Sequence, residues 1–172
     1  MKRILSYVLG AVMMLAFNSF ANAMIVEPAS ADGEKYTFSG DLMVAYSSIT
    51  MKCEVSIEGY MDAASDKFYM TDHLVSGLFP CNTVTSYLSE TADVIELDAD
   101  GGGVVFSEFS MAFGVLFSCA GSQLSLSFEN NGEHVSSLNW SSQSIGECYT
   151  YSELGLEIDS QKSYYYDIKI FP

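Results

Sequence analysis

The sequence predicts an all-β fold, built as an antiparallel β-sandwich or a barrel-like sheet. Three observations predict it: apolar and polar residues alternate from Tyr36 onward, turn-forming residues interrupt this alternation at regular intervals, and helical periodicity is nearly absent. A chain of this length can form one domain that buries roughly two thirds of the surface exposed by its unfolded form.

The N-terminal segment has the order of a secretory signal peptide. Basic residues precede an apolar run at residues 4–17, and small residues lead up to Ala23. The apolar run is shorter than a membrane span. We therefore predict that residues 1–23 are a signal peptide and that residues 24–172 form a single exported β domain. The expected location is secreted or periplasmic, or the cell surface, with no membrane span.

The clearest predicted strands have one apolar and one polar face, as antiparallel sheets allow. They lie at residues 52–58, 123–129 and 153–159. The run Phe109–Phe117 has large apolar residues on one face and small ones on the other, which favours one central strand covered on both sides. Ser163–Phe171 alternates in the same way and predicts a terminal strand.

Evidence for a helix is confined to one short stretch. Asn82 is a candidate cap, and Val84, Tyr87 and Leu88 follow it near helical spacing. This predicts one short helix or a turn. Gly, Asn, Asp and Ser residues mark the turns between the predicted strands, for example at residues 98–103 and 130–132.

Four cysteines, an even number, predict disulfides in an exported protein. They are Cys53, Cys81, Cys119 and Cys148. The first and last intervals are nearly equal, which favours Cys53 with Cys81 and Cys119 with Cys148 among the three pairings. Each bond would stabilise the fold by about 3–4 kcal/mol. The similar order of strands and cysteines also suggests two similar disulfide-bridged halves.

The charge balance excludes several classes of partner. The chain has 7 basic and 22 acidic residues, a net charge of −15, and its lysines beyond the signal peptide are scattered singly. Nucleic acids and anionic membranes are bound by clustered Lys and Arg, so neither is an expected partner. The acidity is typical of a protein that must stay soluble in an external medium.

No pattern of catalytic residues is present, and we predict that the protein is not an enzyme. The sequence lacks a Gly-x-Ser-x-Gly elbow, a His-Glu-x-x-His helix and a phosphate-binding loop. The two histidines, His73 and His134, stand alone, which argues against a zinc site. Asp98 and Asp100 precede three glycines and form either a plain acidic hairpin turn or a calcium site; no other cofactor is expected.

Several segments carry a resemblance to a known family. They are Tyr36–Gly40, Lys52–Gly59, Gly77–Cys81, Ser118–Ser122 and a last cysteine, Cys148. In these segments the chain resembles the secreted protein activators of alkane oxidation found in Pseudomonas and its relatives. The resemblance implies a small exported β protein linked to growth on hydrophobic substrates or to extracellular, biofilm-type assemblies, with no catalytic residues. The acidic composition, rich in Tyr, Met and Phe, departs from that of the family.

The leading functional hypothesis is a protein that acts by contact, with protein partners or with copies of itself through exposed strand edges. One alternative is an exported binder of a small apolar ligand, with methionines and aromatic residues lining a cavity. Another is a pilin-like subunit, although residues 24–33 lack the alternation of a donor strand. Trp140 is expected to pack in the core rather than to be exposed for contact with a sugar or a partner.

Overall fold

The structure is a computed structural model that describes residues 23–121, 123–131, 135–157 and 167–172. The predicted signal peptide lies outside these residues, except for Ala23. No helix among the described residues is long and apolar enough to cross a membrane. The described helical turns are of the 3₁₀ type, η1 (Ala29–Ala31) and η2 (Cys81–Thr83).

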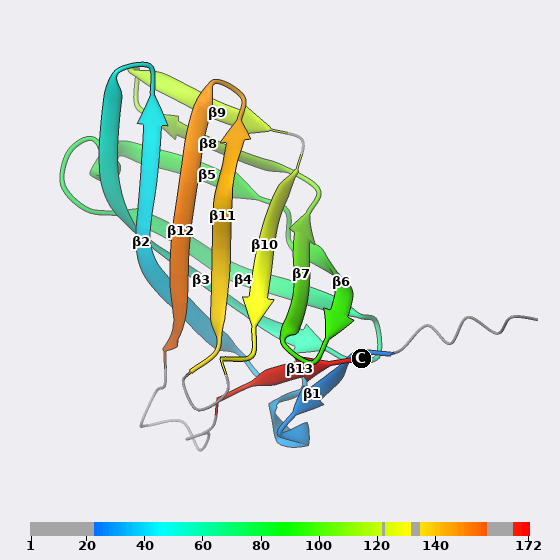
Figure 1. Cartoon of the computed structure of the whole chain (residues 1–172). Helices are drawn as coiled ribbons and strands as arrows, with labels where there is room; N and C mark the ends of the chain where they lie inside the picture. Colours follow the sequence, from blue (N-terminus) through cyan, green and yellow to red (C-terminus); the bar gives the residue numbers. More distant parts are fainter. Residues whose placement is uncertain (1–22, 122, 132–134, 158–166) are drawn as a thin grey trace, which may run out of the picture.

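Eight antiparallel strands close into a barrel in the order β10-β11-β12-β2-β3-β4-β6-β7 (Figure 1). The all-β prediction is thereby confirmed, with a barrel rather than a simple sandwich. The strands are β2 (Tyr36–Tyr46), β3 (Ile49–Asp62), β4 (Lys67–Ser76), β6 (Thr91–Asp98), β7 (Gly101–Phe106), β10 (Leu124–Glu129), β11 (Ser137–Ile145) and β12 (Cys148–Glu157).

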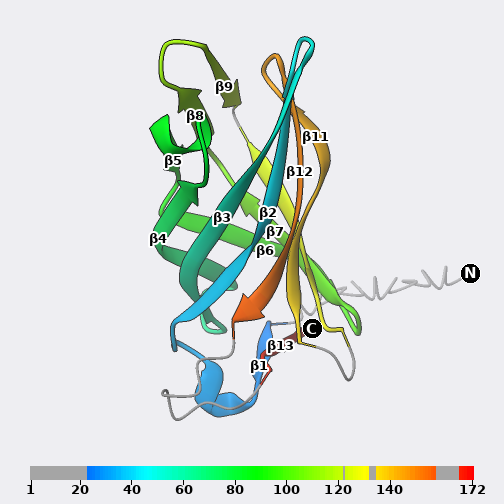
Figure 2. The same cartoon turned by 90° about the vertical axis from the view of Figure 1, so that its left-hand side faces the viewer.

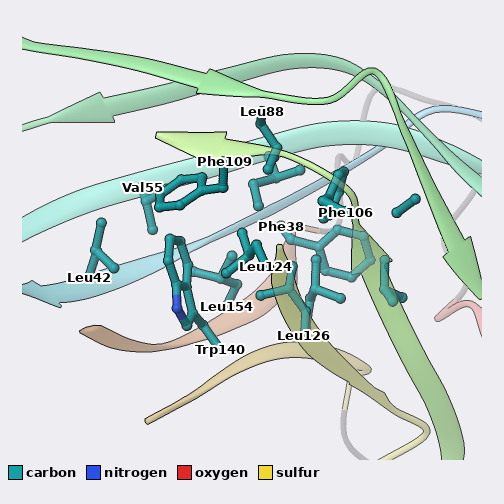
Figure 3. Close-up of a cluster of buried hydrophobic side chains, with 14 of the residues drawn as sticks. Phe38, Leu42, Val55, Leu88, Phe106, Phe109, Leu124, Leu126, Trp140 and Leu154 are labelled. Carbon is teal, nitrogen blue, oxygen red and sulfur yellow. The ribbon is translucent and has the colours of Figure 1, made fainter. Parts of the chain in front are cut away.

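The period-two pattern of the sequence explains the barrel wall. In β3, for example, Cys53, Val55 and Ile57 are buried, while the polar residues between them are exposed or half-buried. The inward side chains of facing strands fill the barrel interior, as Figure 3 shows for Phe38, Leu42, Phe106, Leu124, Trp140 and others. The interior is therefore a packed core.

A second sheet, which we call the cap sheet, covers one end of the barrel. It consists of β5 (Val84–Leu88), β8 (Phe109–Phe113) and β9 (Phe117–Gly121), in that order. β4 pairs with β6 only through Lys67–Tyr69, so the longer strands extend beyond β6 and β7. The cap sheet lies opposite these extensions (Figure 2). Phe109 of the cap sheet meets Trp140 of β11 edge to face, with ring centroids 5.0 Å apart.

The two ends of the described chain pair with each other at the opposite end of the barrel. β1 (Ile25–Glu27) and β13 (Lys169–Phe171) form a small antiparallel sheet in which Val26 lies opposite Ile170. The Asn130 side chain fastens this sheet to the barrel, because its amide donates to the Ile170 carbonyl at 2.6 Å and accepts from the Ile170 N–H at 2.9 Å.

The predicted central strand over Phe109–Phe117 is wrong. The chain turns at Gly114, whose φ of +55° suits glycine, and forms two strands, β8 and β9, instead of one. Leu116 N–H donates to the Phe113 carbonyl at 3.0 Å and closes this turn. Val115 lies in this turn and is fully exposed. Because it is apolar, the alternation of large and small residues in the sequence continues through the turn and hides it.

The other sequence expectations have mixed outcomes. Residues 52–58 and 124–129 lie in strands as predicted. Near Asn82 the structure has a 3₁₀ turn, and the segment with near-helical spacing is strand β5 instead of a helix. Residues 158–166 lie outside the described part, so only the last residues of the predicted terminal strand are placed, in β13. Each half of the chain has its own disulfide, as predicted, and the two halves join in one barrel because β12 pairs along its length with β2.

Candidate functional site

Two disulfides tie the cap sheet to the barrel. Cys53 of β3 bonds Cys81, which lies just before β5, and Cys119 of β9 bonds Cys148 of β12. The Cα atoms are 5.5 Å apart in both bonds, and the pairing is the local one that the spacing favours. One bond lies near each edge strand of the cap sheet, so both edges are held.

Exposed apolar residues occupy the loops at the capped end. We call Ile49, Leu78, Phe79, Val115 and Leu116 the apolar tip residues. Leu78 is 89% exposed, Phe79 72% and Val115 102%. Large apolar side chains are seldom exposed to this degree in a group. Figure 2 shows the β2–β3 and β8–β9 turns, which carry Ile49 and Val115, at the same end of the molecule.

Packing beneath the tips brings their loops together. The Phe117 ring, which follows the β8–β9 turn, stacks on Tyr46 of the β2–β3 hairpin, with centroids 4.5 Å apart. A Cβ at Gly114 would lie 3.4 Å from Oγ1 of Thr83, so the β8–β9 turn adjoins η2. The loop with Leu78 is linked to η2 by the hydrogen bond from Cys81 N–H to the Leu78 carbonyl, 2.8 Å.

Charge is distributed unevenly between the cap and the barrel. Residues 42–51, 77–89 and 109–128 contain no charged side chain, although the chain has 22 acidic residues. The first range is the turn end of the β2–β3 hairpin. The second range and most of the third supply the cap sheet and its loops, and residues 124–128 belong to β10. Ion pairs lie on the barrel wall, including Lys52–Asp41 and Lys67–Asp93, each 2.6 Å. The molecule therefore has an apolar end with little charge and an acidic body.

One carboxylate, that of Glu147, reaches the capped end from the β11–β12 hairpin. Tyr46 Oη donates to Glu147 Oε2 at 3.1 Å. This hydrogen bond, together with the negative charge of Glu147, raises the pKa of Tyr46 above its usual value. The tyrosine stays a neutral donor and keeps the two hairpins in contact.

Several methionines and Trp140 pack inside the protein. Met51, Met61 and Met111 are buried in the core, and Trp140 is 2% exposed. The expected core position of Trp140 is thus confirmed. Its Nε1 has no hydrogen-bond partner among the described residues.

The candidate calcium residues lie in the β6–β7 hairpin. Asp98 Oδ1 accepts a hydrogen bond from the Asp100 N–H at 2.8 Å, which is the role of an aspartate in a turn. Within the described part of the chain, no three His, Cys, Asp or Glu side chains gather around a common point. Calcium binding here stays a prediction.

The histidines do not form a site in the described structure. His73 lies on β4, and its Nε2 is buried without a hydrogen-bond partner among the described residues. His134 lies outside the described residues.

The sequence analysis did not predict the apolar tip residues. A signal was present: Leu78-Phe79 follow Gly77 directly and Val115-Leu116 follow Gly114, and turns at these glycines expose the apolar pairs to solvent.

Comparison with known proteins yields a family but no close relative of known structure. No curated protein and no solved structure matches the chain. One family model, described as alkane oxidation protein activator PraA/PraB-like, matches residues 1–164 of the 172-residue sequence. The match covers the whole barrel, the cap sheet and all four cysteines. The chain therefore belongs to the PraA/PraB-like family of alkane oxidation protein activators.

Proposed function

We propose that the protein supports alkane oxidation without catalysis, by adsorbing to liquid hydrocarbon through its apolar tip residues. The observation that carries this proposal is the group of exposed apolar tip residues at the sparsely charged, capped end of an otherwise acidic protein. The family description, an activator of alkane oxidation, supports the same direction. The disulfides and the predicted signal peptide support a place of action outside the cytoplasm.

Adsorption would be favourable because it removes apolar side chains from water. Complete burial of a Val, Leu or Phe side chain contributes roughly 1.5–3 kcal/mol. Leu78, Phe79 and Val115 are nearly or fully exposed, so together they offer several times that amount. The acidic barrel stays hydrated and prevents the adsorbed protein from entering the hydrocarbon.

The disulfides have a clear role in this mechanism. Exposed apolar loops on a mobile sheet would fold back on one another or open the core to the hydrocarbon. Cys53–Cys81 and Cys119–Cys148 fix the cap sheet on the barrel, so the tips remain exposed and the core remains closed.

The structure favours contact over the other functions considered. Large side chains fill the barrel interior, which speaks against a cavity for a small apolar ligand. The N-terminal strand β1 is paired with β13, which speaks against its donation to a pilin-like neighbour. Partners other than hydrocarbon, including further copies of the chain, could contact the same apolar tip residues. Interfacial tension measures adsorption to hydrocarbon, and light scattering measures association between copies.

Interfacial tension at a hexadecane–water surface tests the proposal. Mature protein (residues 24–172) is expected to lower the tension, and Phe79→Ser/Val115→Ser is expected to lower it much less. The matched control, Ile25→Ser/Ile95→Ser, removes two exposed apolar side chains elsewhere and is expected to behave like the unmodified protein. Equal lowering of the interfacial tension by all three proteins would refute the proposal. The proposal would also be refuted if light scattering showed that Phe79→Ser/Val115→Ser differs from the unmodified protein in oligomeric state and that this difference accounts for its weaker effect.

A further inference from the structure

A groove crosses the outer wall of the barrel, roughly perpendicular to its strands and apart from the apolar tips. It consists of three adjoining hollows. The first, over β6, β7 and β10, shares Glu129 and Ser141 with the second, over β11, β12 and β2. The second shares Gly40 and Asp41 with the third, which reaches β3 and β4. Because neighbouring hollows share lining residues, they lie in a row across the outer wall of the barrel.

Small residues and strand register create the groove. A row of outward residues lies in direct cross-strand register along it: Gly103, Ser127, Asn139, Glu153, Asp41 and Glu54. Gly101–Gly103 place backbone instead of side chains at one end of the floor. Gly40, which lines the second and the third hollow, also contributes backbone only. The groove is thus built into the sheet and does not depend on loops.

One side of the groove combines an exposed aromatic ring with neighbouring hydroxyl groups. Tyr151 of β12 is 47% exposed and lies directly opposite Met43 of β2. A bulge between Trp140 and Gln143 of β11 turns two successive hydroxyls, those of Ser141 and Ser142, toward the solvent beside it. An aromatic face next to several hydroxyls suits a ligand whose rings have apolar faces and polar edges.

The polar groups along the floor are mainly hydrogen-bond acceptors. The Oδ1 atom of Asn139 is buried and has no partner within the described residues. Asp41 lies between Glu54 and Glu153 in register, and Lys52, its ion-pair partner at 2.6 Å, is the lysine that lines the groove. Like charges directly opposite each other destabilise a sheet, so this row of carboxylates lowers the stability of the fold.

We propose that this groove binds a linear polysaccharide without acidic groups. A sugar ring stacks on Tyr151, while Glu153, Asp41 and Asn139 accept hydrogen bonds from ring hydroxyls or amines. The excess of carboxylates excludes anionic glycans by repulsion. A linear chain matches a row of adjoining hollows. If the capped end adsorbs to hydrocarbon as proposed above, the barrel wall would be free to hold a hydrated polymer.

Calorimetric titration with defined hexasaccharides tests this inference. The probes are cellohexaose, xylohexaose, maltohexaose, mannohexaose, N-acetylchitohexaose and its deacetylated form, with an alginate hexamer as the anionic comparison. At least one neutral or amine-bearing probe is expected to bind mature protein. Tyr151→Ala and Glu153→Gln are each expected to weaken that binding by roughly tenfold. Tyr149→Ala removes an equally exposed tyrosine of the same strand outside the groove and is expected to have little effect.

Three outcomes would overturn the inference. The first is that no neutral or amine-bearing probe binds at millimolar concentration, and the second is that Tyr149→Ala and Tyr151→Ala weaken binding equally. The third is that deacetylated chitohexaose is the one saccharide that binds and that hexalysine, a cationic peptide, binds equally well. The last result would mean attraction by surface charge only. The hexadecane assay keeps the two proposals separate, because Tyr151→Ala is expected to lower interfacial tension as the unmodified protein does.

Discussion

Removal of the Cys119–Cys148 bond should weaken the attachment of the cap sheet more than it weakens the barrel. The bond joins residues 29 apart in sequence. Closing a loop of that length in the unfolded chain corresponds to about 3.6 kcal/mol of stabilisation in the chain-entropy model. Both cysteines are almost completely buried and small, so Cys119→Ala/Cys148→Ala removes the cross-link with little loss of packing.

Urea unfolding measures the total effect. With a slope of about 2 kcal/mol per molar urea, the midpoint should fall by about 1.8 M. Cys53→Ala/Cys81→Ala should give a similar fall, because its loop spans 28 residues. Amide hydrogen exchange then locates the effect: β8 and β9 should exchange faster in Cys119→Ala/Cys148→Ala, while the β2–β3 hairpin should exchange only through global unfolding.

Two results would refute this reasoning. A loss below about 1 kcal/mol would show that the unfolded chain is not constrained as the entropy model requires. Equal acceleration of exchange in β9 and in the β2–β3 hairpin would show that the cap sheet and the barrel unfold as one unit, so that the bond does not specifically hold the cap.

Three further predictions follow from individual contacts. Gly40→Ala should destabilise the protein by about 1–3 kcal/mol in urea unfolding because its Cβ would meet the Glu153 carbonyl, whereas Gly155→Ala, with open space around it, should be nearly neutral. Trp140→Ala should cost about 3–5 kcal/mol by leaving a cavity against Phe109, and a smaller loss would mean that the core collapses around it. The hydrogen bond to Asp93 raises the pKa of Lys67, so this pair stabilises the fold below the ordinary lysine pKa and the contribution disappears as the pH rises through the raised value. Lys67→Gln should therefore be slightly less stable than the unmodified protein at neutral pH, with a difference in the urea midpoint that vanishes in strong alkali.

The sequence predicted those strands whose two faces differ in polarity. In β3 and β10 the alternation of buried and exposed residues comes directly from the solvent on one side and the core on the other. The pairing of Cys53 with Cys81 was also predictable, because near-equal local intervals suit local bonds. These features depend on neighbours that are close in sequence.

The failures arose where tertiary context decides. Val115 continued the apolar alternation of Phe109–Phe113, and only the three-dimensional structure shows that it stands in a turn. The spacing of Val84 and Leu88 resembled a helix, but pairing with β8 makes this segment a strand. The groove was unpredictable for a similar reason, because Asp41, Asn139 and Glu153 come together only through the pairing of β11, β12 and β2.

The pairing of β1 with β13 places both ends of the described chain beside each other, at the end of the barrel away from the apolar tips (Figure 1). A tag, dye or solid support attached near residue 24 or residue 172 would thus present the same end outward. Immobilised protein would display its apolar tip residues uniformly, whichever terminus is used. A short linker from Pro172 to Met24 of a second copy would likewise give tandem molecules with tips free to act together.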